Sequence, residues 1–558
     1  MPPERPWLKT QQQATVTTAV PPKKPVYDLL RDSAKRLPDR RCIYYNGTSL
    51  TYGEVNDLSA RFASALVSLG VKKGDRVALF MPNIPQFVIA YFGILEAGGA
   101  VVACNPLYKE RELEHQLRDS GAEVVVATRD VVSGNDLFAS LAACRGRLPL
   151  KHVITASVTD YLPGPKRLLA PLAKVKDVRR SDTLEFLKLV RDSPPQPDPV
   201  AVDPDADLAV LQYTGGTTGI SKGAMLTHWN VYSVTVRGTS FRPLTSGDIF
   251  LAVLPLFHVY GGIVNLTIPF YVGGEVVLLP SFHVEEVLKT IQKRKATVFC
   301  GVPAMYIAIN GNPKSRGYDL SSVRYCVSGG SALPAATRKK FMEITGGTLL
   351  EGYGLSETSA LTHCNPAGTG LAKDGSIGIP FPETDAVIVD LDDPSKLLPT
   401  GEVGELAVKG PQVMKGYWHQ EKETSSAFHD GWFLTGDVAK MDEDGYFYIV
   451  DRKKDMIDVA GEKVYPRDVE EVLFEHPAIK EAAVVAVPDS FSGEAVKAFV
   501  VLKDPAVRLT PKEVCDFCAS RLVKYKVPKE VEFVPDLPKT LIGKVLKRKL
   551  REPTSRQS

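Results

Sequence analysis

The sequence predicts an α/β fold: a large N-terminal body of parallel sheets covered by helices plus a β-rich subdomain, followed by a small mobile α+β C-terminal domain. Up to about Gly375, short β-branched runs alternate with helical patterns, which is typical of parallel sheets covered by helices. Beyond Gly375 the sequence changes to short strands separated by acidic turns. Five consecutive charged residues, 451–455, then separate this β-rich part from a compact tail.

The spacing of the apolar residues predicts the individual elements. Helices are expected where apolar residues recur at helical spacing, over residues 52–69, 109–120 and 511–524. Strands of the body are expected where β-branched and aromatic residues gather, over residues 76–80, 123–127, 249–254, 297–300 and 325–327. Strands of the β-rich subdomain are expected over residues 385–390, 404–409 and 446–451.

The length of 558 residues is too great for one ordinary domain. Residues 1–26 contain several prolines, glutamines and lysines and no apolar targeting segment, so they predict a flexible tail. Residues 27–450 are predicted to form the large domain, in which the ligands described below would bind. Residues 451–455 are predicted to act as a hinge, and residues 456–558 to form the small C-terminal domain.

The composition indicates a globular protein of a reducing compartment. Hydrophobic residues make up 44% of the chain, and the net charge of +3 argues against general nucleic-acid binding. The eight cysteines are scattered, and the close pair Cys515 and Cys518 has no second pair nearby to complete a zinc site. A cytoplasmic location is therefore expected. The longest apolar stretches are interrupted by Pro, Gly and charge, so they suit core elements better than a membrane span.

The loop from Tyr213 to Gly223 contains glycines, three threonines, a serine and Lys222, and it follows an apolar run. Such a loop can bring backbone N–H groups, hydroxyls and a cation against a polyphosphate. It is not a Walker A loop, because Gly223 rather than Ser or Thr follows Lys222 and no glycine precedes it. A flexible surface loop would account for the glycines and serine but hardly for three threonines beside a lysine.

Three further motifs follow in order: Glu351-Gly-Tyr-Gly-Leu-Ser-Glu-Thr, residues 431–437 with 451–455, and Pro538-Lys-Thr-Leu-Ile-Gly-Lys544. Together with the loop, they resemble the adenylate-forming superfamily, which includes acyl-CoA synthetases, firefly luciferase and peptide-synthetase adenylation domains. The resemblance runs from about residue 27 to the C-terminus. Residues 105–117 and 446–456 look most like bacterial long-chain fatty acyl-CoA synthetases.

The resemblance implies activation of a long- or medium-chain fatty acid in two steps, with ATP, Mg²⁺ and coenzyme A (CoA). A carboxylate is a poor electrophile, so it first attacks the α-phosphorus of ATP and expels diphosphate, and CoA then takes the acyl group. The enzyme must bind and neutralise a triphosphate and stabilise charge at its α-phosphate. Glu357 is the expected Mg²⁺ ligand, because magnesium prefers carboxylate, phosphate and water oxygens.

The resemblance also assigns the remaining ATP contacts. The residues expected to hold the phosphates are Thr214, Gly215, Gly216, Thr217, Thr218, Gly219 and Lys222, with Ser356 at the α-phosphate. Tyr353, flanked by Gly352 and Gly354, offers a flat face on which adenine can stack. Asp437 matches the aspartate that accepts both ribose hydroxyls. Arg452 matches an arginine that contacts ribose and phosphate.

The resemblance implies that the small domain adopts two orientations, one for adenylation and one for thioester formation, and that different residues of the domain act in each. Lys544 resembles the lysine that reaches the α-phosphate and substrate carboxylate during adenylation, and Lys454 aligns with the hinge residue. For thioester formation, the loop with Gly461, Glu462 and Lys463 would be presented to CoA. Here the sequence departs from the usual fatty acyl pattern, which has Ser-Gly-Phe-Asn or Gly-Phe-Lys at this place.

His258 resembles the histidine near the acyl carboxylate. The apolar stretch after it contains two adjacent glycines, which predict an acyl tunnel, although each of these residues is equally compatible with core packing. The residues expected to line the acyl site are Tyr260, Gly261, Gly262, Val302, Pro303, Ser328, Gly329 and Gly330. Burial of each methylene in such a tunnel is worth about 0.8 kcal/mol, which would favour long chains over acetate.

Several alternatives remain open at the sequence level. The altered loop is compatible with a different second step, such as transfer to a carrier protein or closure of a 3-hydroxyacyl-adenylate to a β-lactone. A non-catalytic sensor would be expected to lose Lys222, Glu357 or Lys544, and all three are present. The oligomeric state is open, a homodimer included.

Residues 160–180 combine leucines with basic residues and three prolines. They are compatible with a solvated insert and with a basic patch that makes peripheral contact with an anionic membrane, in which case the enzyme is attached at a membrane surface. The partners expected overall are a fatty acid substrate, no nucleic acid, and this peripheral membrane.

Overall fold

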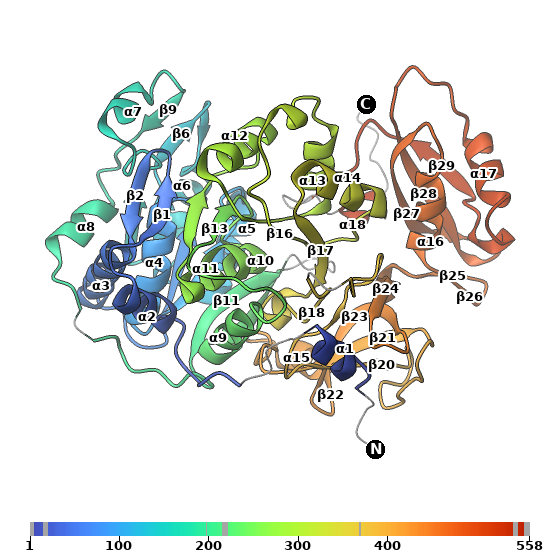
Figure 1. Ribbon diagram of the computed structural model, residues 1–558, viewed down its shortest axis with the longest axis horizontal. Coiled ribbons are helices and arrows are strands. Elements are labelled where there is room, and N and C mark those ends of the chain that lie inside the picture. Colours follow the sequence, from blue (N-terminus) through green and yellow to red (C-terminus); the bar gives the residue numbers. More distant parts are fainter. Residues whose placement is uncertain are drawn as a thin grey trace. The chain divides into compact units, whose positions relative to one another are not determined.

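The computed structural model describes residues 5–14, 20–196, 198–214, 221–367, 370–539 and 545–551 (Figure 1). The chain divides into two compact units. The N-terminal unit comprises Thr10–Thr384 and Lys409–Ser426, and the C-terminal unit comprises Met1–Lys9, Asp385–Val408 and Ala427–Ser558. This division groups the β-rich segments with the tail, whereas the sequence predicted a boundary at residues 451–455. The hinge at that place stays a prediction.

The first sheet of the N-terminal unit has seven strands in the order β10-β8-β5-β3-β4-β11-β12. All neighbours are parallel except β11 and β12, which form an antiparallel pair. Its strands are β3 (Arg76–Phe80), β4 (Ala100–Cys104), β5 (Val124–Thr128), β8 (His152–Ala156), β10 (Leu184–Glu185), β11 (Leu208–Thr214) and β12 (Lys222–Thr227). The helices near this sheet in the chain are α3 (Tyr52–Ser68), α4 (Pro85–Glu96), α5 (Glu110–Ser120), α6 (Ala139–Cys144) and α8 (Phe186–Asp192).

The second sheet has nine strands in the order β19-β18-β17-β16-β15-β13-β14-β1-β2. The run from β17 to β1 is parallel, and β2, β18 and β19 pair antiparallel at the two edges. Its strands are β1 (Arg41–Tyr45), β2 (Thr48–Thr51), β13 (Ile249–Ala252), β14 (Glu275–Leu278), β15 (Val298–Gly301), β16 (Tyr325–Ser328), β17 (Thr348–Tyr353), β18 (His363–Cys364) and β19 (Ile379–Pro380). Its helices include α2 (Asp28–Arg36), α9 (His228–Arg237), α10 (Val259–Gly262), α11 (Ile268–Val272), α12 (Val284–Arg294), α13 (Pro303–Gly311) and α14 (Ala335–Thr345).

A small three-stranded sheet projects from the seven-stranded sheet at the upper left of Figure 1. It consists of β6 (Asp130–Val132), β7 (Asn135–Asp136) and β9 (Val175–Asp177), with α7 (Gly164–Leu169) in the connection that leads to β9. Strand β6 pairs antiparallel with both β7 and β9. The described residues include no helix that is both long and apolar enough to span a membrane.

The C-terminal unit contains two five-stranded sheets. The first consists of β20 (Asp385–Val389), β21 (Gly404–Lys409), β22 (Phe428–His429), β23 (Trp432–Met441) and β24 (Phe447–Arg452). The second consists of β25 (Ile457–Val459), β26 (Glu462–Val464), β27 (Ile479–Asp489), β28 (Gly493–Leu502) and β29 (Glu530–Phe533). Helices α16 (Pro466–Phe474), α17 (Pro511–Ala519) and α18 (Lys547–Arg551) accompany the second sheet.

Local chemistry explains where the helices begin and end. Helix α3 begins at a capping box, in which Thr51 Oγ1 accepts from the Glu54 N–H at 3.2 Å and Glu54 Oε2 accepts from the Thr51 N–H at 2.7 Å. Helix α5 ends at Gly121, whose φ of 63° is the left-handed conformation of a helix C-terminus. The helices predicted over residues 52–69 and 109–120 are confirmed to within one residue at each end.

The N-terminal tail differs from its expectation. Residues Trp7–Gln13 form helix α1, and the Trp7 side chain is only 1% exposed. Its ring lies 6.0 Å from that of Phe447. A Cβ at Gly445 would lie 2.3 Å from the Trp7 backbone nitrogen, so a glycine is needed for this close approach. The prolines, glutamines and lysines of residues 1–26 indicated a flexible tail, because the sequence does not show that Trp7 has a distant packing partner.

Helix α4 is buried along its whole length and ends in a buried acid. Glu96 is 1% exposed, and within the described part of the chain neither carboxyl oxygen has a hydrogen-bond partner. Burial raises the pKa of Glu96 from 4.5 to about 7, and the charge of Arg31 opposes part of that effect. The folded chain therefore favours the neutral carboxyl.

We expect Glu96→Gln to stabilise the protein increasingly as the pH rises above about 4.5. A raised folded-state pKa gives stability that is fully present below pH 4.5 and is lost as the pH rises through about 7. The permanently neutral amide should avoid this loss, so the free energy of unfolding should exceed that of the wild type by about 3 kcal/mol above pH 7 and match it below pH 4.5. Urea unfolding across this range measures the difference, and a constant difference would contradict the assignment.

Candidate active site

The carboxyl ends of four parallel strands, β13, β15, β16 and β17, lie side by side along one border of the nine-stranded sheet (Figure 1). We call this border of strand ends, and not the outer strands, the sheet edge. The register places Gly301 opposite Ser328, and Ser328 opposite Glu351. Ligands of open α/β sheets bind outside such carboxyl ends. The motifs that contain His258, Ser328 and Tyr353 all begin at or just beyond this edge, so the fold gathers them from distant parts of the sequence.

Ser328 has the chemistry of a ligand contact. Its side chain is fully buried, and among the described residues its hydroxyl has no hydrogen-bond partner. A buried hydroxyl without a partner is costly unless a ligand completes it. The backbone around it is fixed, because the hydroxyls of Tyr260 and Tyr306 both donate to the Val327 carbonyl at 2.9 Å.

Tyr260, Ser328 and Gly329 are brought together as the sequence predicted for the acyl wall. A Cβ at Gly329 would lie 3.2 Å from the Tyr260 ring, so the glycine lets the ring cover the backbone beside Ser328. Gly330 has a φ of 85°, which favours glycine. Their role in binding an acyl chain stays a prediction.

Gly261, Gly262, Val302 and Pro303 have a packing role. A Cβ at Gly261 would lie 2.1 Å from the Pro255 carbonyl oxygen, so this glycine lets α10 pack closely against the preceding turn. At Gly262 the corresponding Cβ would lie 3.3 Å from the Leu256 carbonyl oxygen. Val302 is the N-cap residue of α13 and Pro303 its first residue, and both are buried. Their tunnel-lining role stays a prediction.

His258 is the N-cap residue of α10 and is half-buried. Its Nδ1 accepts a hydrogen bond from the Tyr260 N–H at 3.2 Å. An Nδ1 that accepts from a backbone N–H carries no proton, so the neutral ring is protonated at Nε2. The helix start therefore orients the ring and selects its tautomer.

Tyr353 ends β17, and its partner on the antiparallel strand β18 is His363. The two rings make an edge contact with centroids 6.0 Å apart. A Cβ at Gly354 would lie 1.9 Å from the Ala360 carbonyl oxygen, so only glycine permits the turn that follows. This close backbone approach fixes the turn that follows Tyr353, and stacking of Tyr353 on adenine stays a prediction.

Glu357 lies in a short 3-10 helix, Ser356–Thr358, which also contains the predicted α-phosphate contact Ser356. Glu357 Oε1 accepts a hydrogen bond of 2.9 Å from the Tyr417 hydroxyl. Burial raises the pKa of Tyr417, and the Glu357 carboxylate acts in the same direction, so the hydroxyl remains a donor. The Lys222 ammonium lies 5.2 Å from the centre of the Tyr417 ring and also pairs with Glu423.

Tyr417 and Glu423 were missed by the sequence analysis. Tyr417 forms an antiparallel bridge with Ala224, two residues beyond Lys222. This bridge places Tyr417 beside β12, the strand that begins where the predicted phosphate loop ends, although the two segments are far apart in the sequence. The glycine before Tyr417 was the available sequence signal, and the structure shows that Gly416 adopts a φ of 146°, which favours glycine.

The two ends of the predicted phosphate loop are held by a hairpin. Thr214 on β11 pairs directly with Lys222 on β12. Ser221 Oγ donates to the Thr214 carbonyl at 2.6 Å, which closes the base of the loop. Five other predicted phosphate contacts lie outside the described residues: Gly215, Gly216, Thr217, Thr218 and Gly219.

In the C-terminal unit, Asp437 and Arg452 face each other on β23 and β24. Arg452 Nε lies 3.1 Å from Asp437 Oδ1. The turn before Asp437 is fixed by buried Glu405, whose Oε1 accepts from the Gly436 N–H at 2.9 Å and whose Oε2 pairs with the Lys453 ammonium at 2.8 Å. The sequence predicted Asp437 and Arg452, but it gave no sign of Glu405.

The charged run 451–455 is only partly a solvated turn. Asp451 is buried and accepts from the Arg467 N–H at 2.8 Å, and Asp455 pairs with Arg551 at 2.8 Å. Although much of Lys454 is exposed, partial burial lowers the pKa of its ammonium to about 8, and the Arg452 charge acts in the same direction. The run thus makes specific contacts within the C-terminal unit.

The predicted CoA loop is a two-residue hairpin between β25 and β26. Ala460 and Gly461 have φ values of 54° and 92°, as a type I′ turn requires. The Gly461 N–H donates to Asp458 Oδ1 at 2.7 Å, and Glu462 and Lys463 are exposed on β26. Their contact with CoA stays a prediction. Lys544 lies outside the described residues.

A magnesium site made of protein alone is not found in the described part of the chain, where no three His, Cys, Asp or Glu side chains cluster. A site completed by phosphate oxygens fits better. Glu357 would supply one carboxylate to such a site; its side chain accepts from Tyr417, whose ring lies near Lys222 at the end of the phosphate loop. Magnesium commonly binds through one or two carboxylates, substrate phosphates and water.

Comparison with known proteins gives concordant matches. The family model described as AMP-binding enzyme matches residues 30–418, and that of the AMP-binding enzyme C-terminal domain matches residues 468–544. The long-chain-fatty-acid–CoA ligase of Bacillus subtilis (strain 168) is 44% identical over 557 residues, which is 98% of each chain. The ligase of the same name from Salmonella typhimurium is 40% identical over 94% of each. An anthranilate CoA ligase solved with anthranoyl-AMP has a TM-score of 0.84 at 30% identity, covering 95% of this chain and 97% of that chain.

We expect Tyr417→Phe to weaken binding of the magnesium–ATP complex about tenfold, because Glu357 loses a donor while the aromatic ring remains. Calorimetric titration with ATP and magnesium measures the change. Tyr45→Phe is the matched control, because the Tyr45 hydroxyl donates to the Val158 carbonyl at 3.0 Å and has no place in the site. Equal affinities for the two variants would contradict the role given to Tyr417.

Proposed function

This chain belongs to the AMP-binding enzyme family, and we propose that it joins a long- or medium-chain fatty acid to CoA through an acyl-adenylate. It is an AMP-forming acid–thiol ligase. One observation supports the proposal above all others: Lys222, Tyr417 and Glu357 lie together at the end of the phosphate loop, in the arrangement needed to receive a magnesium-bound triphosphate.

In the first half-reaction, a fatty acid carboxylate oxygen attacks the α-phosphorus of ATP, and the bond from this phosphorus to the bridging oxygen breaks. Diphosphate leaves and the acyl-adenylate remains. Lys222 and Thr214 are proposed to hold the departing phosphates, and Ser356 to donate to the α-phosphate. When bound, Mg²⁺ neutralises phosphate charge and assists departure of diphosphate. Tyr417 keeps the Glu357 carboxylate oriented for this cation.

We propose the remaining contacts with the nucleotide and the acyl group from the chemistry of each side chain. The flat face of Tyr353 suits adenine, and the unpartnered hydroxyl of Ser328 suits a polar atom of the adenylate or acyl group. The paired Asp437 and Arg452 are proposed to serve the ribose and phosphate. His258, with its proton on Nε2, can donate to the substrate carboxylate.

In the second half-reaction, the thiol sulfur of CoA attacks the acyl carbon, the bond from this carbon to the phosphate oxygen breaks, AMP leaves, and the thiol proton is released to water. We assign Gly461, Glu462 and Lys463 to CoA, and Lys454 to the movement that separates the two half-reactions. Because long fatty acids partition into bilayers, we also propose that the enzyme makes peripheral contact with a membrane surface.

The substrate proposal is tested by supplying the purified protein with ATP, magnesium, CoA and single acids from acetate to stearate, 3-hydroxy acids included. We expect both AMP and acyl-CoA to form fastest with long unbranched chains, because each buried methylene adds about 0.8 kcal/mol of binding. AMP formation without any CoA thioester, or a β-lactone as product, would contradict the proposed second step.

We expect Lys544→Ala to lower the rate of diphosphate release about a hundredfold or more, because a cation is removed from the developing charge at the α-phosphate. Thioester formation from supplied acyl-AMP should change little. Lys549→Ala is the control, because Lys549 is an exposed neighbour of the same charge. Equal loss of both half-reactions in Lys544→Ala would contradict the assigned role.

A further inference from the structure

Three leucines close together in the sequence are exposed to solvent on the projection that contains α7. Leu168 is 82% exposed, Leu172 81% and Leu169 57%, and we call them the leucine patch. Isolated exposed leucines are ordinary, but a group of this kind commonly marks a surface that binds something. None of the catalytic roles proposed above uses these residues.

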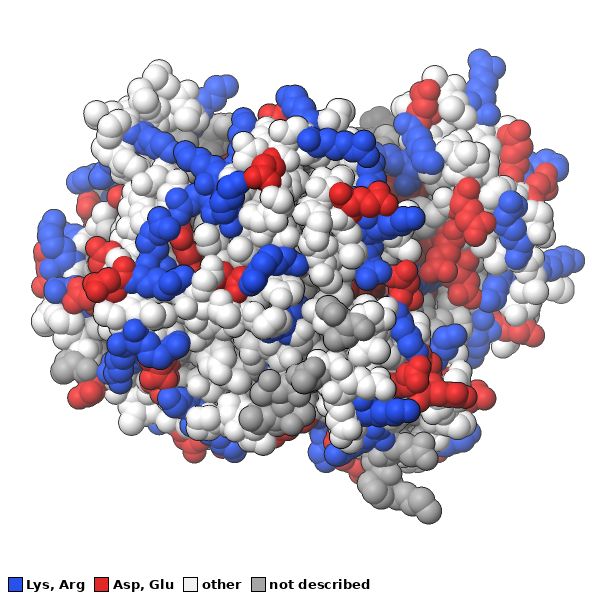
Figure 2. Space-filling view, in the orientation of Figure 1, with Lys and Arg blue, Asp and Glu red and all other residues white. Residues whose placement is uncertain are grey.

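The leucine patch is surrounded by positive charge. Lys166, Arg167, Lys174 and Lys176 are exposed, and no carboxylate among the described residues forms an ion pair with any of them. Within the described part of the chain, the Lys166 ammonium donates only to the Asn46 carbonyl, at 2.8 Å. In Figure 2 the corner where Figure 1 places α7 is largely white, with blue side chains beside it.

The acids closest in sequence are already neutralised by other arginines. Asp160 and Asp177 both pair with Arg129, and Glu185 pairs with Arg179. Asp136 pairs with Arg180, and Asp182 with Arg145. The four cations around the leucine patch therefore present an uncompensated positive surface.

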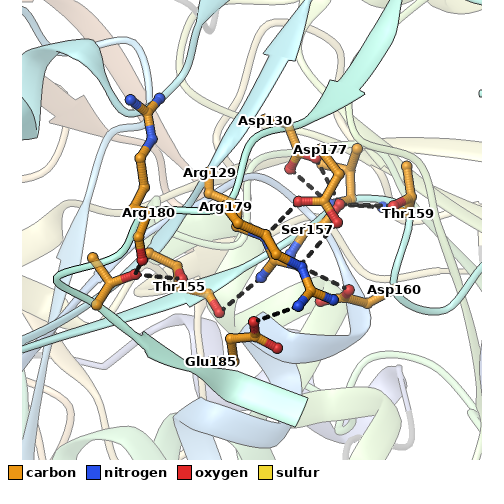
Figure 3. A network of polar contacts seen from close by, with 12 residues as sticks. Arg129, Asp130, Thr155, Ser157, Thr159, Asp160, Asp177, Arg179, Arg180 and Glu185 are labelled. Atoms are coloured by element: carbon orange, nitrogen blue, oxygen red, sulfur yellow. Dashed lines mark hydrogen bonds and ion pairs between the residues drawn. The ribbon is translucent and has the colours of Figure 1, made fainter. Parts of the chain in front are cut away.

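A buried charge network fastens the base of this projection to the core (Figure 3). The Arg129 side chain is 4% exposed and donates to both oxygens of Asp177, at 2.5 and 3.0 Å. The same guanidinium lies 3.4 Å from Asp160. Strand β9 also pairs with β6, with Asp177 opposite Asp130. The network thus anchors the chain on both sides of the leucine patch, at Asp160 before it and at Asp177 after it.

We propose that the leucine patch and its four cations dock this protein peripherally on an anionic phospholipid bilayer. The leucines would enter the boundary between headgroups and acyl chains, and the cations would meet lipid phosphates. This inference rests on the patch itself, and it names the surface for the membrane contact included in the proposed function. A second copy of the chain is a less suitable partner for the leucine patch than a bilayer, because a twofold contact would bring two positively charged surfaces together and they would repel each other.

The test is co-sedimentation of the full-length protein, without ATP or fatty acid, with vesicles of phosphatidylcholine mixed with phosphatidylglycerol or of phosphatidylcholine alone. We expect binding to the mixed vesicles that weakens as salt is added and is much weaker on the neutral vesicles. Leu168→Ser and Lys176→Glu should each weaken binding about tenfold.

Two matched variants control for general effects of polarity and charge. Leu397→Ser removes a leucine that is 48% exposed elsewhere, and Lys340→Glu reverses an exposed charge on α14. Both should bind vesicles as the wild type does, and all four variants should retain the wild-type unfolding midpoint and diphosphate release with a soluble acid. Equal binding to neutral vesicles, equal loss in the control variants, or no vesicle binding at all would overturn the proposal. So would a change in oligomeric state in Leu168→Ser without a change in vesicle binding.

Because vesicle binding is measured without substrates, its failure leaves the ligase proposal untouched. Conversely, absence of ligase activity would leave the vesicle result valid. The two proposals therefore fail separately.

Discussion

The parallel register of β15, β16 and β17 is the constraint on which the site depends. It sets Gly301, Ser328 and Glu351 side by side at one sheet edge, and the loops that leave this edge contain the predicted ligand contacts. Two tyrosine hydroxyls fix the same edge by donating to the single carbonyl of Val327. A shift of one residue in this pairing would exchange the inward and outward side chains of a strand and dismantle the site.

Much of the fold could be predicted from the sequence because local and global signals agree. Residues 52–69 show helical periodicity, and the capping box at Thr51 marks the same beginning that the structure has. The run at residues 76–80 becomes a strand with these bounds, since β-branched and aromatic residues suit a buried sheet. The change of texture after Gly375 correctly indicated the β-rich segments that form β20, β21 and β24.

The features that the sequence did not reveal have a common physical cause: each depends on a packing partner that is distant in the sequence. Trp7 is buried because Gly445 leaves room for its backbone, and nothing near Trp7 in the sequence announces that. Gly261 permits close backbone packing against Pro255, a contact that the sequence does not reveal, and its role in an acyl tunnel stays a prediction. Tyr417 and Glu405 position predicted residues from distant strands, so only the folded chain identifies them.

In the proposed reaction, activation of the fatty acid precedes transfer to CoA as a separate, reversible step on this protein. Exchange of labelled diphosphate into ATP, measured with a long-chain fatty acid and magnesium but without CoA, tests it most directly. We expect exchange that requires the fatty acid and disappears when magnesium is removed. No exchange under these conditions, or exchange that requires CoA, would contradict it.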